Sequence, residues 1–204
     1  MNKLITFKIV ASVSTLVAAL SVASVALAAH GAFSATAQIV QRDPGVVTPI
    51  AQGGDCGLAP GATVTGEIFN GAFGVFSAST AANVIIGSQV SAVQSATLCF
   101  TAGPDSSGNV PFVGAVGGTA TITKGNPAAN GSLVAGYGAI ISGTLNVITG
   151  GLTVDWVPGT GGWAAVSATG IYAGLGGHSG PASATAAAMV GPSPEVGSLT
   201  ISSP

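Results

Sequence analysis

This sequence carries very little charge. Of its 204 residues, 4 are Lys or Arg and 6 are Asp or Glu, whereas about one residue in four is charged in an ordinary soluble domain. A nucleic-acid-binding protein neutralises phosphates with a stripe of basic side chains, and four cations cannot form one. The same shortage excludes a segment that stays disordered through high net charge.

Large side chains are scarce as well. Aromatic residues make up 5% of the chain, and the hydrophobic 48% consists mainly of alanine and valine, while glycine fills 32 positions and proline 11. Glycine and proline favour turns, and valine favours strands. This composition therefore favours a β-rich globular or fibrous protein.

The first 28 residues are typical of a secretory signal peptide. Two lysines flank the start of an apolar stretch that runs over residues 9–27, and small residues around Ala28 form a cleavage site. We predict removal after Ala28, which leaves residues 29–204 as a single domain. A retained membrane anchor stays open as the alternative, because the stretch is nearly long enough to span a bilayer.

Export has two consequences for the mature chain. Cleavage leaves two basic and six acidic residues, a net charge of −4. The remaining sequence contains no run of 18 apolar residues, so we expect no membrane span after cleavage. The predicted location is secreted, periplasmic or at the cell surface.

Two cysteines, Cys56 and Cys99, lie in the exported part. In an oxidising compartment such a pair is expected to form a disulfide. A metal site or a reactive thiol would need partners, but only His30 and His178 remain, and they form no Cys/His pattern with zinc spacing. We therefore predict a structural disulfide, with no metal and no cofactor.

Alternating apolar and polar residues predict strands along most of the mature chain. Clear examples are 33–40, 63–68 and 152–156, where Leu152, Val154 and Trp156 share one face. Shorter runs predict further strands at 82–86, 96–100, 118–123, 138–148, 163–168, 182–190 and 198–202. About ten strands predict one all-β domain, either an antiparallel barrel or a sandwich. Residues 41–61 are predicted to form an irregular connection held by the disulfide.

A glycine-rich stretch between Gly143 and Gly180 holds the most distinctive pattern. A strand led by Trp163 runs into a glycine-spaced turn and then into a second glycine-rich strand; the turn contains Gly170, Tyr172, Gly174 and Gly177. The stretch resembles small secreted bacterial proteins related to the allene oxide cyclase and dirigent β-barrels. It covers about 38 residues, and Ala168 and Ser179 depart from the pattern.

This resemblance implies an eight-stranded antiparallel barrel, often oligomeric, whose lumen binds an apolar small molecule. It carries over no catalytic residue, because the matching segment contains turn glycines rather than polar lumen groups. Tyr172 would be a packing residue that caps one end. Candidates to line an apolar pocket are Trp156, Trp163, Phe100 and Phe112.

No catalytic constellation emerges from the polar residues. Glu67 and Asp155 lie in predicted strands, where two carboxylates could act as acid and base, but the alternation places both on the solvent face. His178 and Ser179 are neighbours, and neighbours on a strand point to opposite faces. We therefore interpret His178 as a solvent-exposed turn residue.

Two functions remain after these exclusions. The first is an exported, non-enzymatic cell-surface or matrix protein that acts by binding or self-assembly, since neutral surfaces repel one another little. Its partners would be further copies of itself, as a homo-oligomer or polymer, or a surface polysaccharide. The alternative is a lumen-binding barrel that serves as a carrier, cyclase or isomerase for an apolar molecule. An outer-membrane barrel is disfavoured, because the sequence ends on Pro204 rather than on an aromatic residue and has few aromatics for girdles.

Overall fold

One antiparallel sheet contains all of the strands that the structure describes. The computed structural model describes residues 32–43, 45–74, 80–189 and 196–204, so the predicted signal segment lies outside the described residues. The elements, in chain order, are β1 (Phe33–Asp43), β2 (Val46–Ile50), β3 (Gly61–Phe73), α2 (Thr80–Ile85), β4 (Gln89–Phe100), β5 (Asn109–Thr123), α3 (Pro127–Asn130), β6 (Ser132–Asn146), β7 (Gly151–Trp156), β8 (Gly162–Ala168), the 3-10 helix η1 (Gly170–Leu175), β9 (Ser179–Met189) and β10 (Val196–Ser203). No helix within those ranges is long and apolar enough to cross a membrane.

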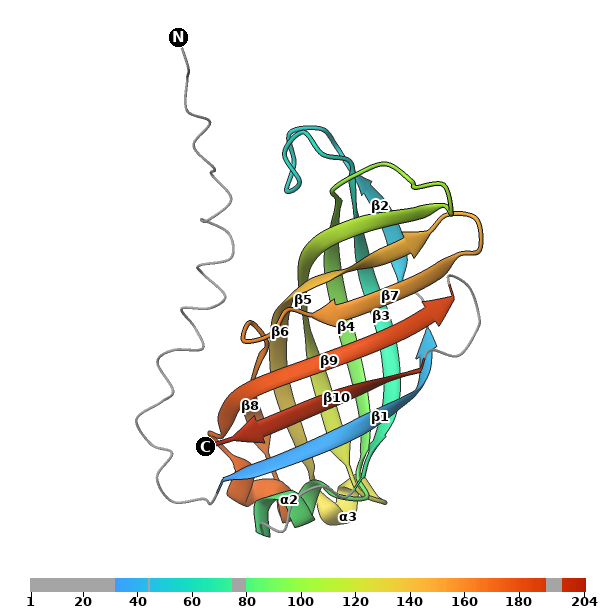
Figure 1. The fold of residues 1–204 in the computed structure, drawn as a ribbon. Helices are drawn as coiled ribbons and strands as arrows, with labels where there is room; N and C mark the ends of the chain where they lie inside the picture. Colours follow the sequence, from blue (N-terminus) through green and yellow to red (C-terminus); the bar gives the residue numbers. More distant parts are fainter. Residues whose placement is uncertain (1–31, 44, 75–79, 190–195) are drawn as a thin grey trace.

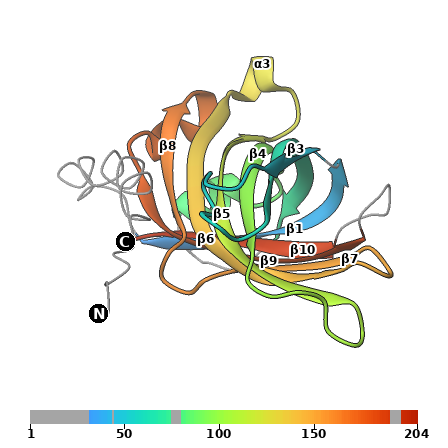
Figure 2. The same ribbon diagram turned by 90° about the horizontal axis from the view of Figure 1, so that it is seen from above.

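The sheet closes on itself as an eight-stranded barrel. Its strands follow the order β1-β10-β9-β7-β6-β5-β4-β3, and β1 pairs with β3 to complete the ring (Figures 1 and 2). β7 and β8 follow one another along the same position of the ring, between β6 and β9. β7 pairs with residues 141–145 of β6 and β8 with residues 133–138, and both also pair with β9. β2 pairs with β3 alone and extends beyond the ring. The all-β prediction is confirmed, and the architecture is a barrel rather than a sandwich.

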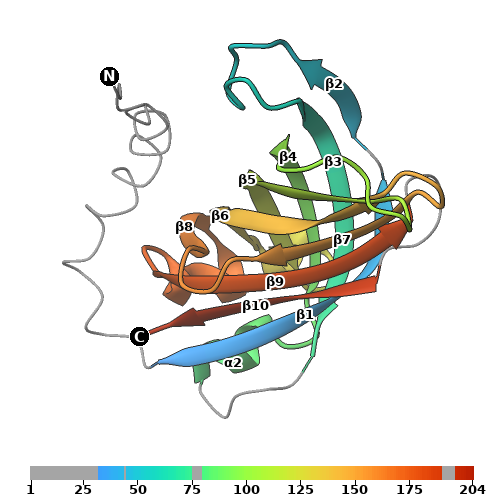
Figure 3. The ribbon, with the colours of Figure 1, turned by 45° about the horizontal axis from the view of Figure 1, so that its top comes forward.

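The two ends of the barrel differ. Helices α2, α3 and η1 gather at one end (Figure 1), where Ile85, Tyr172 and Leu175 are buried. The hydroxyls of Tyr172 and Ser88 are hydrogen-bonded at 2.7 Å and join η1 to the chain before β4. β2 and the loop after it lie at the opposite end (Figure 3). One end of the lumen is therefore plugged by packed side chains.

Small apolar residues fill the part of the lumen next to the plugged end. The buried cluster near the plugged end combines a few large side chains, such as Trp163 and Phe73, with many alanines, including Ala35, Ala37 and Ala92. The interior of an eight-stranded barrel is just wide enough for side chains to fill it or for one small ligand. The abundance of alanine in the sequence thus matches a narrow barrel.

The segment predicted as a strand at 82–86 is instead helical. The structure places α2 over Thr80–Ile85, between two strands that pair directly as neighbours, β3 and β4. A short apolar run does not distinguish a strand from a buried helix. Here the chain crosses the barrel end, and the helix buries Ile85 there.

The region 41–61 is less irregular than predicted. β1 continues to Asp43, and β2 occupies Val46–Ile50, because both segments pair with successive parts of β3. Pro49 lies within β2, and proline is tolerated in an edge strand. In the described part of this region, the irregular loop spans residues 51–60, between β2 and β3.

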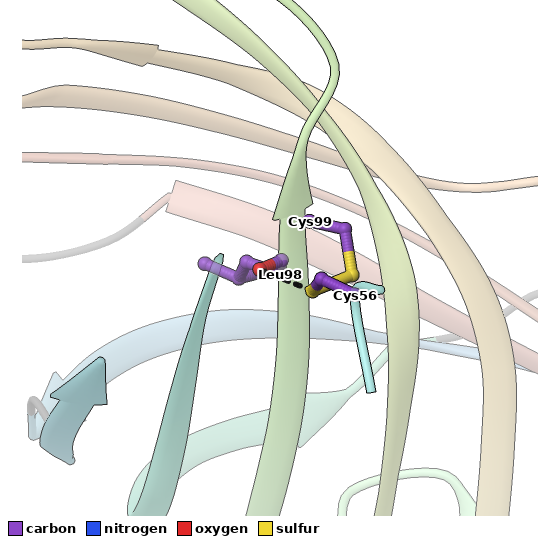
Figure 4. Close-up of a disulfide and its surroundings, with 3 residues drawn as sticks. All are labelled: Cys56, Leu98 and Cys99. Atoms are coloured by element: carbon purple, nitrogen blue, oxygen red, sulfur yellow. Dashed lines mark hydrogen bonds between the residues drawn. A yellow bond between two sulfur atoms is a disulfide. The ribbon is translucent and has the colours of Figure 1, made fainter. Parts of the chain in front are cut away.

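The predicted disulfide is confirmed. Cys56, in the loop after β2, is bonded to Cys99 near the end of β4, with Cα atoms 5.3 Å apart (Figure 4). The Cys56 sulfur lies 3.5 Å from the carbonyl oxygen of Leu98, a contact only, because a disulfide sulfur carries no hydrogen. The Phe100 amide donates to the Pro60 carbonyl at 3.0 Å. The loop is thereby fixed to the barrel end.

Candidate functional site: a polar cluster in the barrel lumen

The lumen contains a cavity on the side away from the helical plug. The space open to the centre of a water-sized sphere is about 80 Å³. Since one water needs roughly 10–15 Å³ of such space, several waters fit, whereas a benzene-sized ligand, which occupies a cavity of about 150 Å³, would need the lining to move or would extend beyond the cavity. The described residues that line it are apolar, apart from Glu67, Gln94 and Thr185. The cavity therefore combines a hydrophobic wall with one concentrated polar region.

Three side chains from three strands form a directed hydrogen-bond chain at this cavity. The Tyr137 hydroxyl donates to Gln94 Oε1 at 3.0 Å, and Gln94 Nε2 donates to Glu67 Oε2 at 2.6 Å. Glu67 is 5% exposed and Tyr137 7% exposed. Placing a carboxylate in such surroundings costs several kcal/mol before its partners compensate. A buried acid of this kind is a candidate functional group.

A β-bulge turns Glu67 into the lumen. In the pairing of β3 with β4, Val64 lies opposite Ala96 and Glu67 opposite Gln94, so β3 carries one extra residue between these pairs. Gly66 lies in the bulge with φ of 70°, a conformation that suits glycine. The extra residue reverses the facing of the rest of β3. The prediction that Glu67 faces solvent is therefore wrong.

Trp156, which lines the cavity, is backed by the ring of Tyr137. Tyr137 stacks on Trp156, with ring centroids 5.9 Å apart and an interplanar angle of 21°. A Cβ atom at Gly118 would lie 2.6 Å from the Tyr137 hydroxyl, so the glycine leaves room for the phenol. Trp156 lines the larger cavity, whereas Tyr137 lines a second cavity of about 20 Å³ toward the plug. The Tyr137 ring thus lies between the two spaces.

The four aromatics predicted to line a pocket occupy different places. Trp156 lines the larger cavity and Trp163 the smaller one. Phe112 is buried in the apolar cluster beside the larger cavity, and Phe100 packs against that cluster. Sequence reasoning missed Gln94 and Tyr137. The isolated glycine before Glu67 was an available signal, since a glycine inside a strand pattern often marks a bulge.

The predicted turn motif forms η1 and its flanks. Gly170 and Gly177 have φ of 58° and 79°, and Gly174 lies within η1. Tyr172 is fully buried against the plug, in the packing position that we expected. Burial raises the pKa of the Tyr172 hydroxyl, while its hydrogen bond with Ser88 acts in the opposite direction.

His178 lies inside the barrel, not in solvent as we had interpreted it. It is 2% exposed, and its Nδ1 lies 3.1 Å from the Ser203 hydroxyl. The chain turns inward after η1, and the imidazole packs beside Phe33 with ring centroids 6.0 Å apart. His178 thus has a hydrogen-bond partner on β10, Ser203, rather than its neighbour Ser179. Asp155, by contrast, is exposed as predicted.

No protein-family model, curated protein or solved structure matches this chain. Within the part that the structure describes, no three His, Cys, Asp or Glu side chains gather into a group that could hold a metal ion. Function is therefore inferred from the lumen and its chemistry.

Proposed function

We propose that this protein binds a small, mainly apolar molecule in the barrel lumen. The supporting observation is a cavity with apolar walls and one polar cluster, in a barrel whose other end is plugged. Small-molecule sites are typically concave and apolar, with a few polar groups that orient the ligand. Burying the apolar part of a ligand would contribute about 25 cal/mol for each Å² removed from water.

Binding fits the side chains better than turnover does. Glu67 is the one titratable group among the described residues that line the cavity, and acid–base chemistry usually requires a positioned donor and acceptor. Trp156 offers an aromatic face, and Gln94 holds the carboxylate in one orientation. We therefore propose a carrier or binding role. Cyclase or isomerase activity stays the less favoured form of the same proposal.

Two sequence-based predictions bear on this role. The resemblance between Gly143 and Gly180 implies a lumen-binding, eight-stranded barrel, and the closed barrel agrees with that architecture. The resemblance itself stays a prediction. We also propose that the protein acts outside the cytoplasm, because residues 1–28 are typical of a signal peptide and because a disulfide such as Cys56–Cys99 persists in oxidising compartments.

Self-association at a cell surface is a second candidate, favoured by the barrel exterior. Strands β4, β5 and β6 contain no charged residue, and Val93, Val113 and Ile140 on them are 42–51% exposed. A second copy would meet no charge repulsion there. Polymerisation by strand donation is less favoured. Among the described strands, β2 alone pairs with a single neighbour, and Pro49 withholds one N–H from it.

Calorimetric titration tests lumen binding. Cyclohexylmethanol is a suitable probe, because it joins an apolar ring to one hydroxyl. Ala184→Leu places a larger side chain in the cavity wall and should abolish binding of the probe. Ser183→Leu adds the same side chain on the exposed face of the same strand and should leave binding intact. Equal binding by all three proteins would place the probe elsewhere and contradict the proposal.

A further inference from the structure

We propose, building on lumen binding as the function, that the polar end of the ligand is a hydrogen-bond donor held by Glu67. The ligand class is then an apolar ring or short chain that carries a hydroxyl or an amine. Molecules of the same shape that end in a carboxylate are rejected.

The direction of the hydrogen-bond chain supports this assignment. Tyr137 donates to Gln94, and Gln94 donates to Glu67, so each donated hydrogen points toward the carboxylate. Hydrogen bonds in such a chain polarise one another. Glu67 is the terminal acceptor of these two bonds at the cavity wall.

A carboxylate can accept several hydrogen bonds at once, so a ligand donor and Gln94 can share Glu67. An ionised carboxyl group offers about four lone-pair positions and donates no hydrogen. Hydrogen bonds to a charged acceptor are stronger than those between neutral groups. A hydroxyl or an ammonium group that reaches Glu67 would therefore be bound, whereas a ligand carboxylate would meet a like charge in apolar surroundings.

The backbone next to Glu67 directs its side chain into the lumen. The bulge at Gly66 reverses the facing of β3 beside the cavity. Without the bulge, the alternation set by Val64 would direct Glu67 to solvent, where a charged side chain avoids the free-energy cost of burial. Bulges that re-aim a side chain are over-represented next to functional sites. The costly placement of an acid in the lumen is explained if Glu67 contacts the ligand.

Calorimetry with three matched probes tests the inference. Cyclohexylmethanol, cyclohexylmethylamine and cyclohexanecarboxylate share one ring and differ in the polar end. We expect the alcohol and the amine to bind the wild-type protein at least about tenfold more tightly than the carboxylate, the ratio typical of a hydrogen bond to a charged group. Glu67→Gln keeps the size of the side chain. In this variant the amine should no longer bind more tightly than the carboxylate.

The possible outcomes separate this inference from lumen binding itself. If the carboxylate binds as tightly as the alcohol and the amine, or more tightly, the donor requirement is wrong, although lumen binding stands. If none of the three probes binds, both fail. The wild-type comparison needs no variant, so a folding defect in Glu67→Gln would not obscure the result. Thermal unfolding of Glu67→Gln without a probe reports whether that variant folds.

Discussion

Glu67 and Gln94 face each other across β3 and β4 inside the barrel, 2.6 Å apart between Oε2 and Nε2. This pairing depends on the bulge, because only the added residue brings Glu67 onto the inner face. One backbone irregularity thus links the sequence to the chemistry of the lumen.

Gly66→Ala should destabilise the protein. The φ of 70° at this position costs a non-glycine residue about 1–2 kcal/mol, and we expect the free energy of unfolding in urea to fall by that amount. Ser95→Ala, opposite the bulge on β4, is the control and should change it by less than about 0.5 kcal/mol. Equal stability of Gly66→Ala and wild type would show that the bulge does not need glycine.

Two buried tyrosines allow a matched test of the polar cluster. Tyr137→Phe removes the donor to Gln94, and Tyr172→Phe removes the hydrogen bond with Ser88. Each change should lower the free energy of unfolding by about 0.5–1.5 kcal/mol. Only Tyr137→Phe should also weaken binding of cyclohexylmethanol. Equal effects of the two changes on probe affinity would contradict a specific role for the lumen cluster.

Breaking the disulfide should loosen the barrel end opposite the plug. The two cysteines are 43 residues apart, and removal of a bond that closes such a loop typically costs about 2–4 kcal/mol. The double variant Cys56→Ser and Cys99→Ser should therefore unfold at a lower temperature. A reductant should shift the wild type by the same amount and the variant not at all. No shift of the wild type in reductant would contradict a stabilising role.

The second candidate function predicts association through the uncharged exterior. Sedimentation should show dimers or larger species at high protein concentration, and Ile140→Lys should return the protein to monomers, because an interface would bury the new charge. Val47→Lys, on β2, adds the same charge at another exposed site and serves as the control. A wild type that stays monomeric at every concentration would eliminate this candidate.

Regular alternation predicted the barrel wall well wherever strands are regular. Leu152, Val154 and Trp156 were expected to share an inner face, and all three line the cavity. The disulfide also followed from two cysteines in one exported chain. Closure into a barrel could not be predicted from alternation, because it depends on the pairing of the first strand with the last: β1 pairs with β10, and partners such as Phe33 and Ser203 lie far apart in the sequence.

The polar site could not be predicted from alternation either. A period of two assigns Glu67 to the solvent face, and a one-residue bulge reverses that assignment. His178 was misjudged for a related reason, since its burial depends on a contact with Ser203, 25 residues away in the sequence. Both errors arise where backbone irregularity or a long-range contact overrides the local pattern.

The most direct measurement of lumen binding is the nuclear magnetic resonance signal of the two indole N–H groups. Trp156 lines the larger cavity, whereas Trp163 lies beyond Tyr137 and donates to the Ser202 carbonyl at 2.8 Å. During titration with cyclohexylmethanol, the Trp156 signal should shift and saturate while the Trp163 signal stays nearly unchanged. An unchanged Trp156 signal, with the protein folded and the probe in excess, would contradict a ligand-binding lumen.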